Sequence, residues 1–147
     1  MTLSLAELFR REYEPMVRLA YLLVGSEPVA EELVQDAFFA VHRHWSSLHN
    51  PGGYLRTSVV NGCRSHQRRA ALERRRRPRP EATAQLEADE LWDALDHLPH
   101  KQRAALVLRF YDDATEADIA TTLGVRPATV RSLVHRGLAK LRKEIEP

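Results

Sequence analysis

The sequence predicts an all-α protein of two small helical domains joined by a flexible linker, and three observations lead to this expectation. Apolar residues recur at helical spacing along nearly the whole chain, and no segment alternates with the period of two that marks a strand. Pro78 and Pro80 interrupt this pattern, because proline lacks a backbone donor and disfavours helix in the residue before it. Basic and acidic residues also fall in separate blocks. We therefore expect an N-terminal domain over residues 1–75, a linker over 76–86 and a C-terminal domain over 87–147, each with its own core.

Each expected helix has a local reason to begin where it does. Residues 5–23 carry a first apolar stripe, and Ser26 is the N-cap of a second helix whose apolar residues recur every four positions. Asn50 followed by Pro51 is typical of an N-cap and a first helical position, and the helix that they begin continues into a run of arginines. Pro99 starts a further helix, and two short helices complete the chain.

The composition excludes several classes of protein. With 147 residues the chain can form one ordinary domain or two small ones. No apolar run approaches the roughly 18 residues of a membrane span, and Glu7 introduces charge too early for a signal peptide. The one cysteine, Cys63, excludes an internal disulfide and a multi-cysteine zinc site. We expect a cytoplasmic protein that needs neither a metal nor another cofactor.

The net charge of +2 conceals two basic blocks. Residues 51–80 carry nine Lys and Arg against one Asp or Glu, and residues 126–147 carry six against two. Between them, residues 81–96 carry six acidic residues and no Lys or Arg. One such block is as well explained by a solvated helix face, but two separate blocks on apolar-periodic helices favour binding to nucleic acid.

Residues 116–135 fit the template of a helix-turn-helix, with the sequence EADIATTLGVRPATVRSLVH. Ala120 lets the two helices approach closely, Gly124 supplies the positive φ of the turn, and Val130 packs the second helix against the first. Pro127 suits the first position of that second helix. An ordinary helical hairpin with a solvated basic face is the alternative, and it is disfavoured because so many template positions match at once.

The second helix of this motif would present a basic outer side to the major groove of duplex DNA. Arginine can pair bidentately with guanine, and the other side chains can contact phosphates or base edges. The candidate duplex-binding residues are Arg126, Thr129, Arg131, Ser132, His135, Arg136 and Lys140. Arg142 and Lys143 continue the helix and suit the DNA backbone.

Three segments, taken in order, resemble the extracytoplasmic-function sigma factors of bacterial RNA polymerase, a group of the sigma-70 family, and most of all their compact actinobacterial branch. They are AEELVQDAFFAVHRHW, NPGGYLRTSVVNGCRSHQRR and LPHKQRAALVLRFYDDATEADIATTLGV with the helix after it. The resemblance covers nearly the whole chain except the linker. It implies a specificity subunit without catalytic activity of its own, which recruits core RNA polymerase to promoters and initiates transcription. The implied partners are the β′ clamp helices and the β flap of the polymerase, promoter DNA, and an anti-sigma factor such as many relatives have.

The resemblance also implies a division of labour between the domains. The N-terminal domain would bind core polymerase and melt the −10 promoter element, and the C-terminal domain would recognise the −35 element as duplex. Carried over by position, polymerase binding falls on Glu32, Leu33, Gln35, Asp36 and Phe39. The resemblance also implies that Asn61 binds a flipped base of the −10 element in a pocket. The phosphates of the single strand would be held by Arg56, Arg64, Arg68 and Arg69. Tyr54 stands where the family usually has tryptophan, and we expect it in the core.

Other functions explain less of the sequence. A stand-alone helix-turn-helix regulator would use the N-terminal domain for dimerisation or signal input, and it has no need of a second basic helix carrying Asn61. A protein that only sequesters a partner leaves both basic blocks unexplained. Catalysis is disfavoured because no nucleophile–base set or phosphate loop is present, and His42 and His44 point to different sides of a helix.

Overall fold

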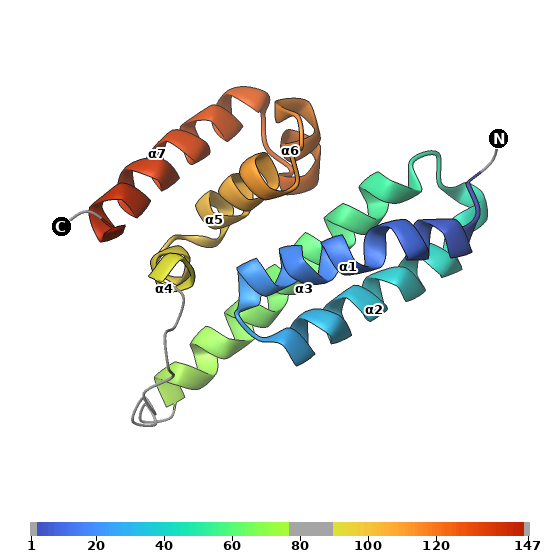
Figure 1. Ribbon diagram of the computed structural model, residues 1–147, viewed down its shortest axis with the longest axis horizontal. Coiled ribbons are helices and arrows are strands. Elements are labelled where there is room, and N and C mark those ends of the chain that lie inside the picture. Colours follow the sequence, from blue (N-terminus) through green and yellow to red (C-terminus); the bar gives the residue numbers. More distant parts are fainter. Residues whose placement is uncertain (1–2, 77–89, 146–147) are drawn as a thin grey trace.

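The computed structural model describes residues 3–76 and 90–145, which are almost entirely helical and contain no strand (Figure 1). The expected linker, residues 76–86, lies outside these ranges apart from Arg76 at the end of a helix. None of the helices in the described ranges has the length and apolar character needed to cross a membrane. The elements in chain order are α1 (Leu5–Val24), α2 (Glu27–Arg43), η1 (Trp45–Ser47), α3 (Pro51–Arg76), α4 (Glu90–Asp96), α5 (His100–Leu106), η2 (Val107–Tyr111), α6 (Glu116–Leu123) and α7 (Pro127–Ile145).

Side-chain caps fix the beginnings of several helices. The Ser26 hydroxyl accepts a hydrogen bond from the Val29 N–H at 3.4 Å, so the N-cap predicted from the sequence is confirmed. Asn50 Oδ1 accepts from the Gly53 N–H at 3.1 Å and starts α3 as expected. Thr115 caps α6 in the same way, and so sets the first helix of the helix-turn-helix.

The N-terminal module consists of α1, α2 and α3, and α2 runs antiparallel to the other two (Figure 1). Its interior is made of fully buried aliphatic side chains, among them Leu19 and Leu23 of α1, Val34 of α2 and Val59 of α3. Each such burial stabilises the fold by about 1.5–3 kcal/mol relative to an exposed side chain. Tyr54 is partly buried and packs against this core, as expected.

The C-terminal module consists of α4, α5, η2, α6 and α7, and it confirms the helix-turn-helix template. Ala120 and Val130 are 6% and 2% exposed between the two helices, and Gly124 ends α6 in the left-handed conformation with φ 67°. Gly137 lies where α7 crosses α5, and a Cβ there would come within 2.9 Å of Leu106 Cδ1. The absence of a side chain at this position therefore brings the two helices close together.

The two modules share one apolar core, and the expectation that each buries its own was wrong. A single cluster of buried residues runs from Leu19 and Val59 in the N-terminal module to Leu108, Ile119 and Val130 in the C-terminal module. The three residues Leu95, Leu98 and Leu106 form a smaller separate cluster. Helical periodicity predicts which side of a helix is apolar, but not which other helix covers it.

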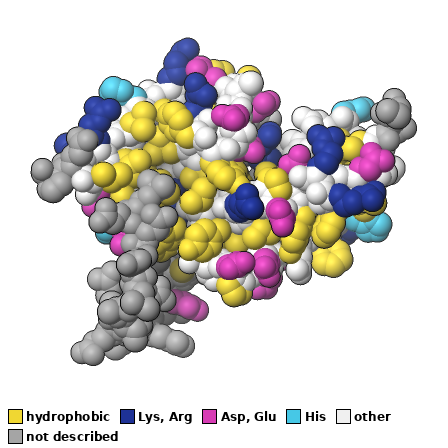
Figure 2. Space-filling model, viewed as in Figure 1, with side chains coloured by type: hydrophobic (Ala, Val, Ile, Leu, Met, Phe, Trp, Pro, Cys, Tyr) yellow, Lys and Arg dark blue, Asp and Glu magenta, His cyan; other side chains and the backbone are white. Residues whose placement is uncertain are grey.

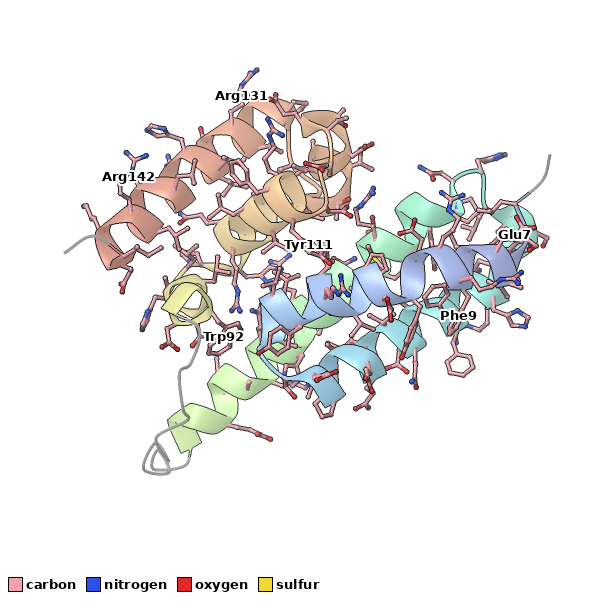
Figure 3. All side chains as sticks on the ribbon, in the orientation of Figure 1. Glu7, Phe9, Trp92, Tyr111, Arg131 and Arg142 are labelled. Atoms are coloured by element: carbon pink, nitrogen blue, oxygen red, sulfur yellow. The ribbon has the colours of Figure 1, made fainter. Side chains whose placement is uncertain are left out.

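Two side chains from the C-terminal module dock on the end of α1. The indole of Trp92 packs over Gly25, the left-handed residue that ends this helix, and Figure 3 shows Trp92 reaching from α4 toward it. Arg103 is only 2% exposed; its Nε donates to the Leu22 carbonyl at 2.8 Å, and its Nη1 lies 3.4 Å from Asp96 Oδ1. Its guanidinium thus caps one orphan carbonyl at the C-terminus of α1.

A third contact between the modules joins Gln67 to His100. The Gln67 amide nitrogen donates to the Leu23 carbonyl, and its amide oxygen contacts His100 Nδ1. Burial, together with the charge of nearby cations, lowers the pKa of His100 from 6.5 to about 4. These cations are Arg64, Arg103, Arg68 and Lys101.

Candidate nucleic-acid interface

The outer side of α7 carries the duplex-binding candidates, all of which are exposed. They are Arg126, Thr129, Arg131, Ser132, His135, Arg136 and Lys140. Figure 3 shows Arg131 and Arg142 projecting from α7 away from the N-terminal module. Because α4, α5 and α6 pack against the opposite side of α7, this helix is free to enter a groove of DNA.

These candidates do not form one stripe; they lie on two flanks of α7. Successive helical residues are about 100° apart, so Arg131 and His135 fall on one flank, whereas Arg136 and Lys140 fall on the other. Ser132 lies between the flanks, opposite the buried Val130. This arrangement suits a helix inserted in the major groove, where the small central residue faces the bases and the flanks face the two backbones.

Arg131 belongs to a shallow cavity of about 330 Å³ that sequence reasoning did not anticipate. The cavity is also lined by Glu116, His135 and Arg109, the last of which comes from η2. Arg131 Nη1 lies 3.2 Å from Glu116 Oε1, but the two side chains are 68% and 39% exposed, so the pair contributes little and can exchange for phosphate. The sequence does not indicate a role for the exposed Arg109, because it is a single cation within an apolar stretch.

On α3, three of the five candidates for the −10 element share one side of the helix. Asn61 and Arg68 are exposed and Arg64 is half-buried, and all three fall within about 60° of one another around the helix axis. Arg69 is exposed on another side. The shared side can offer hydrogen bonds to a base and cations to a phosphate backbone.

Arg56 is oriented differently from the other four. Its Nε lies 2.7 Å from Asp112 Oδ2 in the C-terminal module, and the two side chains are 25% and 14% exposed. In this arrangement of the modules Arg56 is occupied by its own chain. Asp112 is the residue that follows η2 and ends it.

The candidate polymerase-binding residues lie along the outer side of α2. Glu32, Gln35 and Asp36 are exposed, and Phe39 is 63% exposed. Leu33 differs, because it is half-buried and packs against the core.

Phe39 extends into an aromatic groove between α1 and α2. Phe9 stacks on Tyr13 with ring centroids 4.8 Å apart and meets Phe38 at 5.1 Å. These rings, with Gln35 and Phe39, line a cavity of about 380 Å³. Figure 3 shows Phe9 beside α2 at this surface.

A second apolar surface lies between the modules. Figure 2 shows hydrophobic side chains gathered across the middle of this face of the molecule. Two adjoining cavities, of about 150 and 500 Å³, share Leu22 of α1 and Tyr111 of η2 as lining residues. Phe110 and Leu138 extend the groove toward α7 and are 59% and 36% exposed.

Within the described parts of the chain, the remaining reactive side chains form no second site. His, Cys, Asp and Glu residues there do not cluster as a metal site would require. Cys63 is fully buried, and burial raises its thiol pKa to about 12, so it is a protonated core residue rather than a nucleophile.

Two helical modules, the second a helix-turn-helix with an exposed basic helix, define a DNA-binding protein with two separate contact surfaces. Residues 8–73 match the family described as Sigma-70 region 2, and residues 88–141 match Sigma-70, region 4. The chain therefore belongs to the sigma-70 family of RNA polymerase sigma factors, and within it to the extracytoplasmic-function group.

Named relatives support this assignment along nearly the whole chain. The RNA polymerase sigma-E factor of Streptomyces coelicolor is 31% identical, over 97% of this chain and 86% of that protein. The ECF sigma factor SigM of Mycobacterium tuberculosis is 35% identical, over 92% of this chain and 74% of that protein. SigE of Mycolicibacterium smegmatis is 36% identical, and the match covers 92% of this chain but 59% of that longer protein.

A solved structure has the same fold. The sigma factor RpoE from Bartonella quintana, in complex with the anti-sigma factor NepR, superposes with a TM-score of 0.79 over 96% of both chains at 22% identity. The all-α, two-module prediction is thereby confirmed.

Proposed function

We propose how this sigma factor divides promoter recognition between its modules. The helix-turn-helix inserts α7 into the major groove of the −35 element, and α3 binds the melted −10 strand. The observation that carries the proposal is the separation of the two basic surfaces. The outer side of α7 and the Asn61–Arg68 side of α3 belong to different modules, and each is accessible to DNA.

On duplex DNA, the proposed contacts follow the two flanks of α7. Arg131 and His135 on one flank, and Arg136 and Lys140 on the other, can each meet phosphates or base edges across the groove. Arg126, Thr129 and Ser132 complete the set nearest the beginning of the helix. We add Arg109 as a phosphate contact, because it lines the same cavity as Arg131.

On the single strand, Asn61 is the proposed contact to an unstacked base, and Arg64, Arg68 and Arg69 hold phosphates. A base leaves the stack only if the protein supplies hydrogen bonds and cations that repay the lost stacking. The sequence motif around Asn61 and its exposure on α3 support this role. Arg56 joins this set only when its pair with Asp112 is broken.

Core RNA polymerase is the proposed partner of α2. Glu32, Gln35 and Asp36 provide polar contacts to the β′ clamp helices, and Phe39 with its aromatic groove accepts an apolar side chain. The C-terminal module would meet the β flap. In this proposal the protein acts in the cytoplasm, and the polymerase supplies all of the catalysis. An anti-sigma factor is a further proposed partner, supported by the complex in which the Bartonella relative was solved.

The direct test is run-off transcription from a cognate promoter with purified core polymerase. Transcripts should require this protein, and promoter-dependent transcripts in its absence would defeat the proposal. Asn61→Ala should impair strand opening in permanganate footprints more than it impairs duplex binding. Normal melting by this variant would remove Asn61 from the −10 site without affecting the wider assignment. A stand-alone regulator would bind duplex but give no polymerase-dependent transcript.

A further inference from the structure

The ion pair between Arg56 and Asp112 connects the proposed strand-binding helix to the other module. The two residues lie 56 positions apart in the chain, and their atoms approach to 2.7 Å. Both side chains are largely screened from water, at 25% and 14% exposed. A charge-assisted hydrogen bond in this setting is stronger than an exposed ion pair. The positive charge of Arg56 is therefore neutralised within the chain.

Asp112 is held in place by the backbone around it. Its N–H donates to the Val107 carbonyl at 3.2 Å, and the Ala114 N–H donates to the Leu108 carbonyl at 2.9 Å. Asp113 between them adopts the left-handed conformation with φ 52°. The tight turn fixes the backbone of Asp112 and the direction of its Cα–Cβ bond, so the fold of η2 brings this side chain within reach of Arg56.

We propose that Asp112 is an internal competitor for DNA phosphate at Arg56. In the free protein its carboxylate occupies the guanidinium, and separation of the modules releases Arg56 to the promoter strand. The inference rests on the proposed role of α3 in binding the −10 strand. Carboxylate and phosphate present the same kind of anionic oxygen to an arginine, so the two compete for one site.

The contact between the modules is suited to a reversible closure. Separating them exposes part of the continuous apolar core, so the free protein remains closed unless another surface compensates. The same contact region holds buried polar atoms without a hydrogen-bond partner among the described residues, namely Trp92 Nε1, His100 Nε2 and Arg103 Nη2. Unpaired buried groups cost free energy, so the closed form is less stable than a fully paired interface would be.

The test compares two neighbouring aspartates in the free protein. Asp112→Asn breaks the ion pair, and Asp113→Asn makes the same change in net charge at an exposed position whose left-handed backbone asparagine tolerates. The probe is a fluorescein-labelled oligothymidylate, and binding is followed by fluorescence anisotropy at several salt concentrations. Asp112→Asn should bind about 3–10 times more tightly than Asp113→Asn. Its salt dependence should be steeper by about 0.7 in log K against log salt, as one added phosphate contact requires.

Arg56→Gln completes the design as a double-mutant cycle. In the wild-type background this substitution should cost less oligonucleotide affinity than it does in the Asp112→Asn background, because Asp112 occupies Arg56 only in the former. In the Asp112→Asn background, Arg56→Gln should cancel the gain in oligonucleotide affinity. If circular dichroism shows that Asp112→Asn is unfolded, Arg56→Gln still tests the inference. A clear loss of oligonucleotide affinity in the free Arg56→Gln protein would overturn it.

The outcomes separate this inference from the proposed function. If Asp112→Asn and Asp113→Asn bind the oligonucleotide equally tightly and still support run-off transcription, Asp112 does not compete with phosphate at Arg56. The proposed function would then remain intact. Loss of polymerase-dependent transcription by the wild-type protein would refute the proposed function itself. With core polymerase present, both aspartate variants should give transcript levels within twofold of each other, because the modules are then already apart.

Discussion

Replacing Gly25 by alanine should detach α4 from the end of α1. Gly25 ends α1 with φ 75°, and a Cβ at this position would overlap the indole ring of Trp92. Gly124 ends α6 with φ 67°, and no described atom lies within 4 Å of the place its Cβ would take. Gly25→Ala and Gly124→Ala therefore share the same backbone strain and differ in the contact with Trp92.

The expected losses of stability follow from the backbone strain and from the contact with Trp92. An alanine held in the left-handed conformation costs about 1–2 kcal/mol at either position. Displacing the partly buried Trp92 exposes on the order of 100 Å² of ring, which at about 25 cal/mol per Å² contributes about 2.5 kcal/mol. Gly25→Ala should lower the free energy of unfolding by about 4 kcal/mol, and Gly124→Ala by about 1–2 kcal/mol.

Urea unfolding followed by tryptophan fluorescence measures both effects. The chain has two tryptophans, so a Trp45→Phe background leaves Trp92 as the only reporter. In native buffer, Gly25→Ala should shift the emission of Trp92 to longer wavelengths, and Gly124→Ala should leave it unchanged. Equal losses of stability with no change in Trp92 emission would refute the docking of α4 on α1.

Three further predictions concern single side chains. Arg131→Ala should weaken binding to the cognate −35 duplex by about 1–3 kcal/mol in mobility-shift titrations, because a bidentate base contact contributes that much; an equal loss on scrambled duplex would assign Arg131 to phosphate. Acidification from pH 7 to pH 5 should lower the free energy of unfolding. His100 stays neutral in the folded protein down to its pKa of about 4, whereas in the unfolded chain it has the ordinary histidine pKa of 6.5 and binds a proton. His100→Gln should flatten that part of the profile, and an unaltered slope would contradict the burial of this ring. Cys63, with its thiol pKa raised to about 12, should resist iodoacetamide at pH 8 in native buffer and react in urea, as mass spectrometry would report; rapid native alkylation would disprove its burial.

Local chemistry made much of the fold predictable. Ser26 and Asn50 begin helices because the side-chain oxygen of each accepts a hydrogen bond from the N–H three residues later in the chain. This bond does not depend on how the rest of the chain folds. Ala120, Gly124 and Val130 define the helix-turn-helix for the same kind of reason, since steric fit and a positive φ act within some ten residues. The exposure of the α7 candidates followed directly from this motif.

The sequence by itself therefore determined the helices, the helix-turn-helix and the residues that its outer side presents. Only the tertiary structure decided how the modules meet: that one apolar core spans both, that Arg103 is buried against the end of α1, and that Asp112 neutralises Arg56. Caps, turns and amphipathic stripes depend on neighbours within a few residues, whereas these contacts join residues 56 and 81 positions apart. A pattern along one helix indicates that a side will be covered, but its partner is chosen by the packing of the whole chain.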